Sequence, residues 1–391
     1  MNYLFSYHTL RLGGIEVYIK DLAIKLNDLG DTVTIFLANS TGHSSELLEE
    51  LNEAGINVTI LKKNIHWLLN CIKPIKLSKK TIIISFDVLS YAFSEVIFRK
   101  NNLVHITGIY HIDEWRFNNW PIMNLLSKKI LSRIHGDNFF VYNEFAKDKF
   151  FKLLKSSPSL VPIGVKIPSM KYIIPNNKSF NILLVARVVG WKSFLWQSIK
   201  YLNNTSFNYQ LHIIGDGTEM KNLKQYVKIN LNENKVRFYG NVSTQKMLEI
   251  AQKMDIAVSV GTSAVILSSI GLPTLVGIEN SNRDILLNYG FFSNIKGYTF
   301  NEKEAKLEKS SFDIIEKYLN LEINLKKEII KNHILQAKKF DLNTCVNIFR
   351  EKSILSKIFS IPLMYSLLII LLFFINKLTP KKFQYWQRRI N

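Results

Sequence analysis

The chain has 391 residues, 47% of them hydrophobic and 21% charged, which is typical of a globular protein with room for two domains. Its formal net charge of +20 predicts an anionic partner, either a membrane surface or a nucleic acid. The two cysteines, Cys71 and Cys345, fit neither a metal cage nor a disulfide framework, so we expect a reducing compartment. The N-terminal sequence lacks the basic region and apolar core of a signal peptide.

The first half of the chain alternates strand patterns with helical patterns. Strands are predicted at Tyr3–Tyr7, Thr32–Leu37, Asn57–Leu61, Thr81–Phe86, Leu103–Ile109 and Asn138–Tyr142. The first helix is expected from about Ile15 to Leu29. This alternation indicates an α/β fold with a parallel sheet covered on both faces. We expect a first domain over residues 1–165, closed by VPIGV, and a linker over 166–179.

The second half repeats the alternation, with polar or small residues at the strand ends. The residues after the strands FNILLV, YQLHII and DIAVSV are Arg187 and Lys192, Gly215 and Asp216, and Gly261, Thr262 and Ser263. Ligands of parallel sheets bind outside the carboxyl ends of the strands, where helix N-termini present free N–H groups to anions. The strand ends therefore predict a pocket for a phosphorylated ligand. Helices around 302–320, 323–339 and 342–355 complete a second domain over 180–355.

The C-terminal residues 356–391 combine an apolar segment with a basic tail. Residues 358–375 form 18 uncharged residues, about the length of a helix that crosses a hydrocarbon core of ~30 Å. A buried core helix is the alternative, but soluble helices rarely lack a polar face over five turns. A full span would export the basic tail, against the positive-inside rule. We therefore favour a helix embedded in one leaflet and broken near Pro362, and its topology stays open.

Two further segments mix basic and apolar residues. Residues 62–80 hold six lysines and no acid, and residues 115–136 also lack acids. Basic and aliphatic residues at helical spacing favour an anionic membrane surface. Nucleic acid is the competing partner, and it ranks lower because each segment carries an aliphatic face that a phosphate backbone would not use.

Several motifs, in order along residues 1–350, carry a family resemblance. They are LRLGGIEVYIKDLAIKLNDLGDTVTIF, VPIGV, VARVVGWKS, IIGDGTEMKNL and GLPTLV. Together they resemble glycosyltransferase family 4, of the type that builds bacterial envelope polysaccharide or lipopolysaccharide. The resemblance implies a GT-B fold, with two Rossmann-like domains facing a cleft, the first for the acceptor and the second for a nucleotide sugar. It also implies hexosyl transfer with retention of configuration, without a metal ion or a cofactor.

Glycines and cations in two loops are the predicted donor site. Gly13 and Gly14 lie between a strand and a helix, where missing side chains let backbone N–H groups approach a diphosphate, although a tight turn explains them equally well. Glu16 fits a helix-capping role. Arg187 and Lys192 would stabilise the leaving diphosphate as its negative charge develops, with ordinary surface cations as the alternative.

Two histidines belong to the region of the fifth predicted strand: His105 lies within the strand, and His111 follows it. The resemblance places His111 near the transferred sugar, and we predict it as the catalytic residue. His105 lies inside the strand and is expected to be a core histidine. Asp113 and Glu114 are nearby acids, and the sequence does not choose a general base between them. The basic, apolar segment 115–136 comes next, where membrane-bound relatives place a helix that docks onto lipid acceptors.

The chain departs from the family in one loop. The family carries two glutamates eight positions apart, which contact the donor sugar and the ribose. Here no carboxylate occurs between Ala257 and Val276, and Ile266 occupies the place of the second glutamate. Gly261, Thr262 and Ser263 would instead offer N–H and hydroxyl donors. The family's Lys-Gly pair is Lys192-Ser193 here.

Three hypotheses follow. The first is a glycosyltransferase at the cytoplasmic face of the inner membrane, which moves a sugar from a nucleotide diphosphate sugar to a lipid-linked or cell-envelope glycan acceptor. It would contact the membrane through 62–80, 115–136 and 356–391. The second is a non-catalytic scaffold with this fold in a polysaccharide assembly complex, suggested by the missing glutamates. The third, a nucleic-acid binder, leaves the apolar segment without a role, so we expect no nucleic-acid partner.

Overall fold

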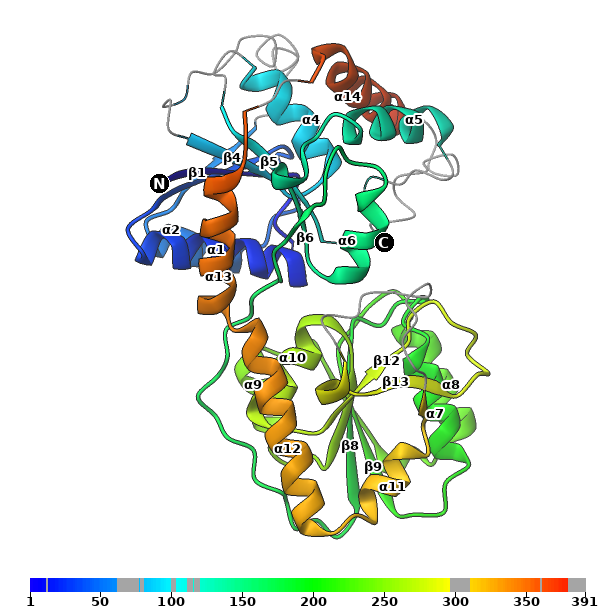
Figure 1. Ribbon diagram of the computed structural model, residues 1–391. Helices are drawn as coiled ribbons and strands as arrows, with labels where there is room; N and C mark the ends of the chain where they lie inside the picture. Colours follow the sequence, from blue (N-terminus) through cyan, green and yellow to red (C-terminus); the bar gives the residue numbers. More distant parts are fainter. Residues whose placement is uncertain are drawn as a thin grey trace. The chain divides into compact units, whose positions relative to one another are not determined.

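The computed structural model divides the chain into two units (Figure 1). It describes residues 1–11, 13–61, 77, 81–99, 103–110, 115, 120–295, 310–358 and 361–378. Unit 1 consists of Met1–Gly164 together with Leu342–Asn391, and unit 2 consists of Val165–Asp341. Each unit contains its own seven-stranded sheet with helices on its faces.

Unit 1 is built on a parallel sheet with the strand order β3-β2-β1-β4-β5-β6-β7. Its strands are β1 Asn2–Tyr7, β2 Thr32–Leu37, β3 Asn57–Ile60, β4 Thr81–Ser85, β5 His105–Ile109, β6 Phe139–Val141 and β7 Ser159–Leu160. Its helices are α1 Gly14–Asp28, α2 Ser45–Glu53, α4 Val88–Ile97, α5 Pro121–Leu131, η1 Gly136–Asn138, α6 Glu144–Phe151, α13 Leu342–Leu355 and α14 Leu363–Leu378. All six predicted strands are present within two residues of their expected bounds. The two-residue strand β7 was not predicted, because so short a segment has no readable pattern.

Helix α13 lies in unit 1, although we expected it to close the second domain at residue 355. The ring of Phe349 packs against Tyr3, Phe5 and Phe140, with centroid distances of 5.7, 6.2 and 5.7 Å. Arg350 Nε also lies 3.0 Å from Oδ2 of the buried Asp31. The aromatic core of the first sheet therefore holds this helix, and the first unit is completed by the last part of the chain.

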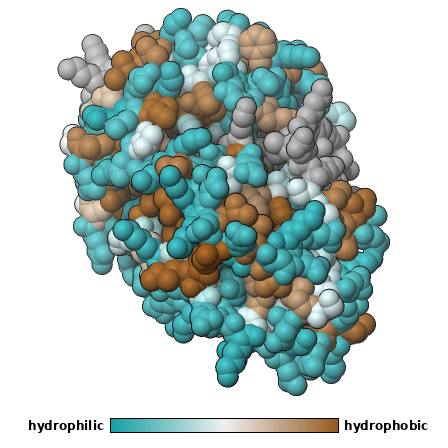
Figure 2. Space-filling view, turned by 60° about the horizontal axis from the view of Figure 1, so that its bottom comes forward, coloured by the Kyte–Doolittle hydropathy of each residue, from teal (hydrophilic) through white to brown (hydrophobic). Residues whose placement is uncertain are grey.

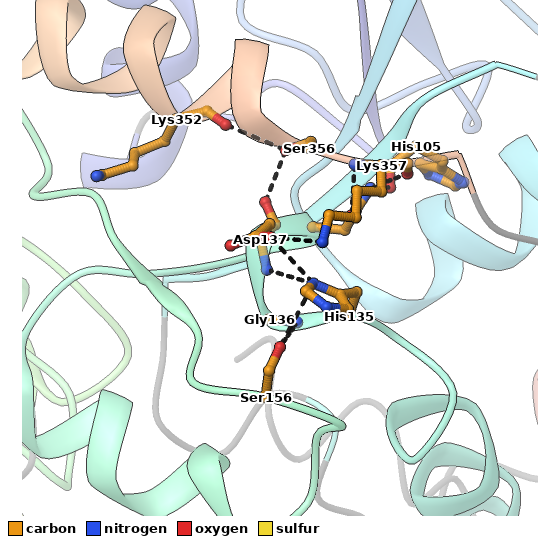
Figure 3. Close-up of polar contacts among 9 residues, drawn as sticks. His105, His135, Gly136, Asp137, Ser156, Lys352, Ser356 and Lys357 are labelled. Atoms are coloured by element: carbon orange, nitrogen blue, oxygen red, sulfur yellow. Dashed lines mark hydrogen bonds and ion pairs between the residues drawn. The ribbon is translucent and has the colours of Figure 1, made fainter.

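Backbone and side-chain hydrogen bonds fix the chain after α13 (Figure 3). Ser356 Oγ donates to the carbonyl of Asp137 at 2.6 Å, and the Lys357 N–H donates to Asn138 Oδ1 at 2.9 Å. Asn138 Nδ2 donates in turn to the carbonyls of Lys357 and His105, at 2.7 and 3.0 Å. These contacts tie the residues between α13 and α14 to η1, where β6 begins.

Helix α14 packs on unit 1 with one side. It begins after Pro362, and Ile369 and Phe373 are buried, Phe373 within an apolar cluster that includes residues of β1, β2 and α4. The guanidinium of Arg133 lies 5.1 Å from the ring centre of Tyr365. Across the described residues, no helix is long and apolar enough to cross a membrane. The expected membrane-embedded helix over 358–375 is therefore not supported, because part of that segment is buried in unit 1.

Unit 2 has the strand order β10-β9-β8-β11-β12-β13-β14, with β8 to β12 parallel and the last two strands antiparallel. Its strands are β8 Phe180–Val185, β9 Tyr209–Ile214, β10 Val236–Gly240, β11 Ile256–Ser259, β12 Thr274–Gly277, β13 Leu287–Phe291 and β14 Ser310–Ser311. Its helices are α7 Phe194–Asn203, α8 Met220–Asn230, η2 Glu233–Lys235, α9 Thr244–Ala251, α10 Gly261–Ile270, η3 Phe292–Asn294, α11 Ile314–Leu319, α12 Ile323–Ala337 and η4 Lys338–Phe340.

The edges of unit 2 differ from the expected boundaries. The predicted linker 166–179 packs on this unit, since Tyr172 is buried and its hydroxyl donates to the carbonyl of Met254 at 2.8 Å. The predicted helix over 302–320 is shorter, because Ser310–Ser311 form β14, and residues 302–309 lie outside the described residues. The Val165 N–H donates to the carbonyl of Phe340 at 2.8 Å, so the two ends of the unit are adjacent.

The face drawn in Figure 2 is largely hydrophilic, with small hydrophobic groups between the polar side chains.

Candidate functional site

In unit 2, the predicted phosphate-binding residues lie at one edge of the sheet. Strands β8 and β11 are neighbours, and the strand order reverses between them, which is where open α/β sheets bind ligands. Arg187 and Lys192 follow β8, and Gly261 follows β11. Arg187 is exposed, whereas only 8% of Lys192 is exposed. The structure therefore brings the two loops to the same edge, but it presents only one of the two cations to solvent.

Glycines allow the loops after β8 and β9 to pack closely. A Cβ atom on Gly215 would lie 1.8 Å from the carbonyl oxygen of Ala186, and one on Gly217 would lie 2.2 Å from that of Val188. The Val188 N–H donates to the carbonyl of Asp216 at 2.9 Å, while the Asp216 side chain is exposed. Gly215, predicted as a donor-binding residue, therefore has a packing role that holds the loop of Arg187 in place.

Lys192 has a carboxylate partner that the sequence did not suggest. Its ammonium group forms a hydrogen-bonded ion pair with Glu279, which follows β12 and is 3% exposed. The same ammonium group lies 4.5 Å from the ring centre of Trp191. A diphosphate that bound Lys192 would have to share it with Glu279. The chain thus supplies a carboxylate close to this loop, although none occurs between Ala257 and Val276.

Ser193 has a specific set of hydrogen-bond partners. Its Oγ donates to the carbonyl of Ile278 at 2.9 Å and accepts the N–H of Ser281 at 3.1 Å. Gln197 Nε2 extends this network by donating to the carbonyls of Asn282 and Ile285, at 2.7 and 2.6 Å. The residues after β12 are therefore fixed against the start of α7, which also fixes Glu279 beside Lys192.

The N-terminus of α10 can present N–H groups to an anion. Its N-cap residue, Val260, has no side-chain acceptor, so the first-turn N–H groups are left to other partners. Gly261 has a φ of 62°, a left-handed conformation that favours glycine. Thr262 and Ser263 follow in the first turn and are half-buried. Ile266, one turn further along α10, is half-buried and packs against the apolar core of the unit.

In unit 1, the predicted glycines lie at the start of α1. Gly13 is the N-cap, with extended φ and ψ of −161° and 166°, and Gly14 is the first helical residue. Gly13 has no side chain with which to cap the helix, so backbone N–H groups of the first turn can face a ligand. The prediction for Gly13 and Gly14 is thus compatible with the local geometry, and a turn remains a sufficient explanation.

The predicted catalytic histidine, His111, lies outside the described residues, as do Asp113 and Glu114. So does almost all of the segment 62–80. His105 is a core histidine, as we expected. Its Nδ1 lies 2.5 Å from Glu95 Oε1, its Nε2 lies 2.8 Å from Ser85 Oγ, and its ring stacks on Tyr91.

Sequence reasoning missed a histidine at the carboxyl end of the first strand of unit 1. His8 follows β1 directly, and Asp87 follows the neighbouring strand β4. His8 Nδ1 lies 3.0 Å from Asp87 Oδ2. The rule that selected the strand ends of the second half would have found both residues, because each comes within two residues of a strand. No group of His, Cys, Asp or Glu among the described residues has the arrangement of a metal site.

Comparison with known proteins gives a family match for unit 2 and a fold match for the chain. Residues 170–334 match the family described as Glycosyl transferases group 1. The lipopolysaccharide outer core galactosyltransferase WaaB, in its apo form, is 17% identical, with a TM-score of 0.60 over 90% of this chain and 99% of that chain. Anabaena HepE in complex with UDP-glucose is 14% identical, with a TM-score of 0.65 over 90% and 98%.

A third solved structure contains UDP together with two further compounds. A variant of S. aureus TarM in complex with fondaparinux, α-GlcNAc-glycerol and UDP is 11% identical, with a TM-score of 0.61 over 90% of this chain and 99% of that chain. These likenesses show the GT-B fold with its two Rossmann-like units, as the sequence predicted. No curated protein matches the chain at a significant level.

Proposed function

We propose that this protein is a glycosyltransferase that moves a sugar from a nucleotide diphosphate sugar to a glycan acceptor. The observation that carries the proposal is the match of residues 170–334 to Glycosyl transferases group 1. It falls on the unit in which Arg187, Lys192 and the start of α10 share one sheet edge. HepE, which has the same fold, binds UDP-glucose, and this supports a nucleotide sugar as donor.

The charges at this edge suit a leaving diphosphate. In the proposed reaction an acceptor hydroxyl oxygen bonds to the sugar carbon, the bond between that carbon and the diphosphate breaks, and the hydroxyl proton is released. Negative charge develops on the phosphate oxygens of the leaving diphosphate. Arg187 and the first N–H groups of α10 would stabilise that charge in place of a metal ion. Glu279 would hold the ammonium group of Lys192 in a fixed position through their ion pair. We further propose retention of configuration, as the family resemblance implies, and His111 as a residue beside the transferred sugar.

We also propose that the protein docks side-on onto the cytoplasmic face of an anionic membrane, which would give it a lipid-linked acceptor. Helices α5 and α14 of unit 1 expose apolar side chains: Ile122, Leu125, Met364, Leu367, Leu368 and Leu371, with exposed fractions of 36 to 60%. Lys128, Lys129 and Arg133 lie on or beside α5, and neither helix contains an acid. We call these apolar and basic residues the α5–α14 surface. Aliphatic side chains with basic neighbours suit the interface of an anionic bilayer.

Calorimetry with UDP, GDP and a panel of their sugars tests the main proposal. A glycosyltransferase binds one nucleotide, and Arg187→Ala should weaken that binding at least about tenfold through loss of a charge-assisted contact. The control is Arg237→Ala, because Arg237 is an exposed arginine on β10, away from β8 and β11. The second candidate, a non-catalytic scaffold, is favoured by the buried pairing of Lys192 with Glu279 and predicts no nucleotide binding by the wild-type protein.

A further inference from the structure

His8 and Asp87 occupy the ligand-binding position of the unit 1 sheet. Strands β1 and β4 are neighbours, and β2 and β3 lie on one side of them while β5, β6 and β7 lie on the other. The strand order therefore reverses between β1 and β4, and the carboxyl ends of these strands form the place where such sheets bind ligands. His8 and Asp87 project from the two loops that begin there.

Asp87 is held by hydrogen bonds that define how it faces His8. Its Oδ1 accepts the Ser90 N–H at 2.9 Å, which caps α4, and its Oδ2 accepts the Ser90 hydroxyl at 2.6 Å. Burial alone would raise the pKa of Asp87, but the positive charge of His8 when its ring is protonated, and in either form of the ring the hydrogen bonds from His8 and Ser90, lower this pKa below its ordinary value. The carboxylate is therefore ionised at neutral pH and accepts a hydrogen from Nδ1 of His8 at 3.0 Å.

The position of the hydrogen on Nδ1 decides what the other nitrogen can do. In a neutral imidazole with its hydrogen on Nδ1, the Nε2 atom is a hydrogen-bond acceptor. None of the described residues hydrogen-bonds to Nε2 of His8, and 24% of the His8 side chain is exposed. A ligand that contacts Nε2 of His8 would therefore meet an acceptor nitrogen whose direction Asp87 has already fixed.

The backbone of His8 is also fixed. Its carbonyl accepts the Asn39 N–H at 3.0 Å, and its ring lies 4.3 Å from that of Tyr7 between centres. His43 braces the loop from the other side, because its Nδ1 accepts the Leu10 N–H at 3.2 Å and its Nε2 lies 2.9 Å from the Asn39 carbonyl. The loops after β1 and β2 thus form one hydrogen-bonded assembly that limits movement of the His8 ring.

We propose that Nε2 of His8, oriented by Asp87, binds a hydroxyl group of the glycan acceptor, so that this pair forms an acceptor subsite in unit 1. The chemistry favours a neutral, hydroxyl-bearing ligand, since an acceptor nitrogen beside a buried carboxylate repels a phosphate or a carboxylate and attracts an O–H group. The inference rests on the proposed function, and it assigns to His8 a contact separate from that proposed for His111.

Steady-state kinetics on the full-length protein test the subsite. The donor is UDP-glucose, and the acceptors are methyl α-glucoside, methyl α-galactoside and methyl α-N-acetylglucosaminide, with UDP release measured with and without each one. With the most effective acceptor, His8→Phe should raise the acceptor KM about tenfold, the cost of one lost hydrogen bond. Release of UDP to water and the affinity for UDP should stay within about twofold of wild type.

Two more variants separate binding from folding. His8→Gln keeps an amide oxygen that accepts a hydrogen bond and should recover part of the acceptor affinity. Asp87→Asn keeps a good helix cap for α4 but loses the fixed ring orientation, so its acceptor KM should lie between those of wild type and His8→Phe. The control is His135→Gln, because His135 precedes η1 and β6 at the opposite edge of the sheet.

The outcomes distinguish this inference from the proposed function. An unchanged acceptor KM in His8→Phe, with UDP release intact, overturns the acceptor subsite and leaves the glycosyltransferase proposal standing. If His8→Phe loses water-dependent and acceptor-dependent UDP release equally, the acceptor subsite is overturned too. Such a result would show that His8 has a structural role. A wild-type protein that binds neither UDP nor GDP and releases no nucleotide from any of their sugars overturns both proposals.

Discussion

Lys192 and Glu279 form an ion pair in the interior of unit 2, between the loop after β8 and the residues after β12. Lys192 is one of the two cations that the sequence assigned to a diphosphate, yet its charge is already balanced within the protein. The pair places a carboxylate next to the proposed phosphate site, although no carboxylate occurs between Ala257 and Val276. We infer that Glu279 positions Lys192 rather than binding the donor itself.

Breaking this pair from one side should destabilise unit 2. Glu279→Gln leaves a buried ammonium group without a counter-charge, which should cost about 3 kcal/mol of unfolding free energy. Hydrogen exchange of peptides from β12 measures the loss. The double variant Glu279→Gln with Lys192→Met should recover much of it, because neither charge is then left alone. Lys200→Met is the control, since Lys200 pairs with Asp284 at the surface and should change exchange little. Equal effects of Glu279→Gln and Lys200→Met on exchange would show that the buried ion pair contributes no more to the stability of unit 2 than the surface pair does.

A side chain at Gly215 should disrupt the loops of the donor site. Gly215→Ala places a Cβ against the backbone carbonyl of Ala186, which cannot move aside without breaking the hydrogen bonds between the two loops. We expect a loss of roughly 2–4 kcal/mol in stability and weaker nucleotide binding, measured by thermal unfolding and calorimetry. Gly190→Ala, in the same loop after β8, has no atom within 4 Å of the new Cβ and should be tolerated. A tolerated Gly215→Ala would mean that the loops pack less tightly than described.

Stability of unit 2 should fall as the pH is lowered from 6.5 towards 4. Burial lowers the pKa of His333 to about 4, below its ordinary value of 6.5, and its Nε2 accepts the Thr274 N–H at 3.0 Å. Between these pH values the unfolded chain binds a proton that the folded chain does not, so stability rises with pH and is lost on acidification. The full effect is roughly 3 kcal/mol.

Hydrogen exchange of α12 at pH 7 and pH 5 measures this dependence, after correction for the intrinsic effect of pH on exchange. His333→Gln should flatten it, although not completely, because burial and the charge of Arg237 also lower the pKa of His212 to about 4. An unchanged slope in His333→Gln would exclude His333 as its source.

The α5–α14 surface should bind anionic vesicles. Co-sedimentation with phosphatidylglycerol vesicles is expected for the wild-type protein, with little binding to phosphatidylcholine alone, because each basic residue near the surface contributes about 1 kcal/mol. Leu367→Glu with Leu371→Glu should reduce binding at least about tenfold, since two charges would enter the apolar face. The control is Ile229→Glu, because Ile229 is 74% exposed on α8 of unit 2. Concentration-dependent dimers that disappear in the double variant, without vesicle binding, would instead identify the surface as a contact between copies.

The alternation of strands and helices could be predicted from the sequence because apolar runs such as Phe180–Val185 are bounded by polar or glycine residues. Partners far apart in the sequence could not. The α13 pattern indicates an apolar face, but nothing in it shows that Phe349 packs against Tyr3 and Phe5. The same limit applies to α14: its composition favoured a helix embedded in one leaflet of a membrane, and nothing in the sequence shows that it packs against α4 and α5.

The candidate site shows the same division between local and distant information. Arg187 and Gly261 could be placed at one sheet edge, because the carboxyl ends of parallel strands meet there. Glu279 could not be assigned to Lys192, which lies 87 residues earlier. His8 could have been predicted, because ligands of parallel sheets bind at the carboxyl ends of the strands and His8 directly follows β1. It was missed because the family resemblance in this region depends on the glycine pair Gly13 and Gly14.

The return of residues 342–378 to the first unit has a consequence for how the protein is made. All residues of unit 2 are consecutive, and its ends meet where Val165 pairs with Phe340. A ribosome therefore releases a complete unit 2 while unit 1 still lacks α13, and with it the ring of Phe349 that fills its aromatic core. The sheet formed by residues 1–164 must therefore wait until unit 2 and then α13 have been synthesised before its interior is closed.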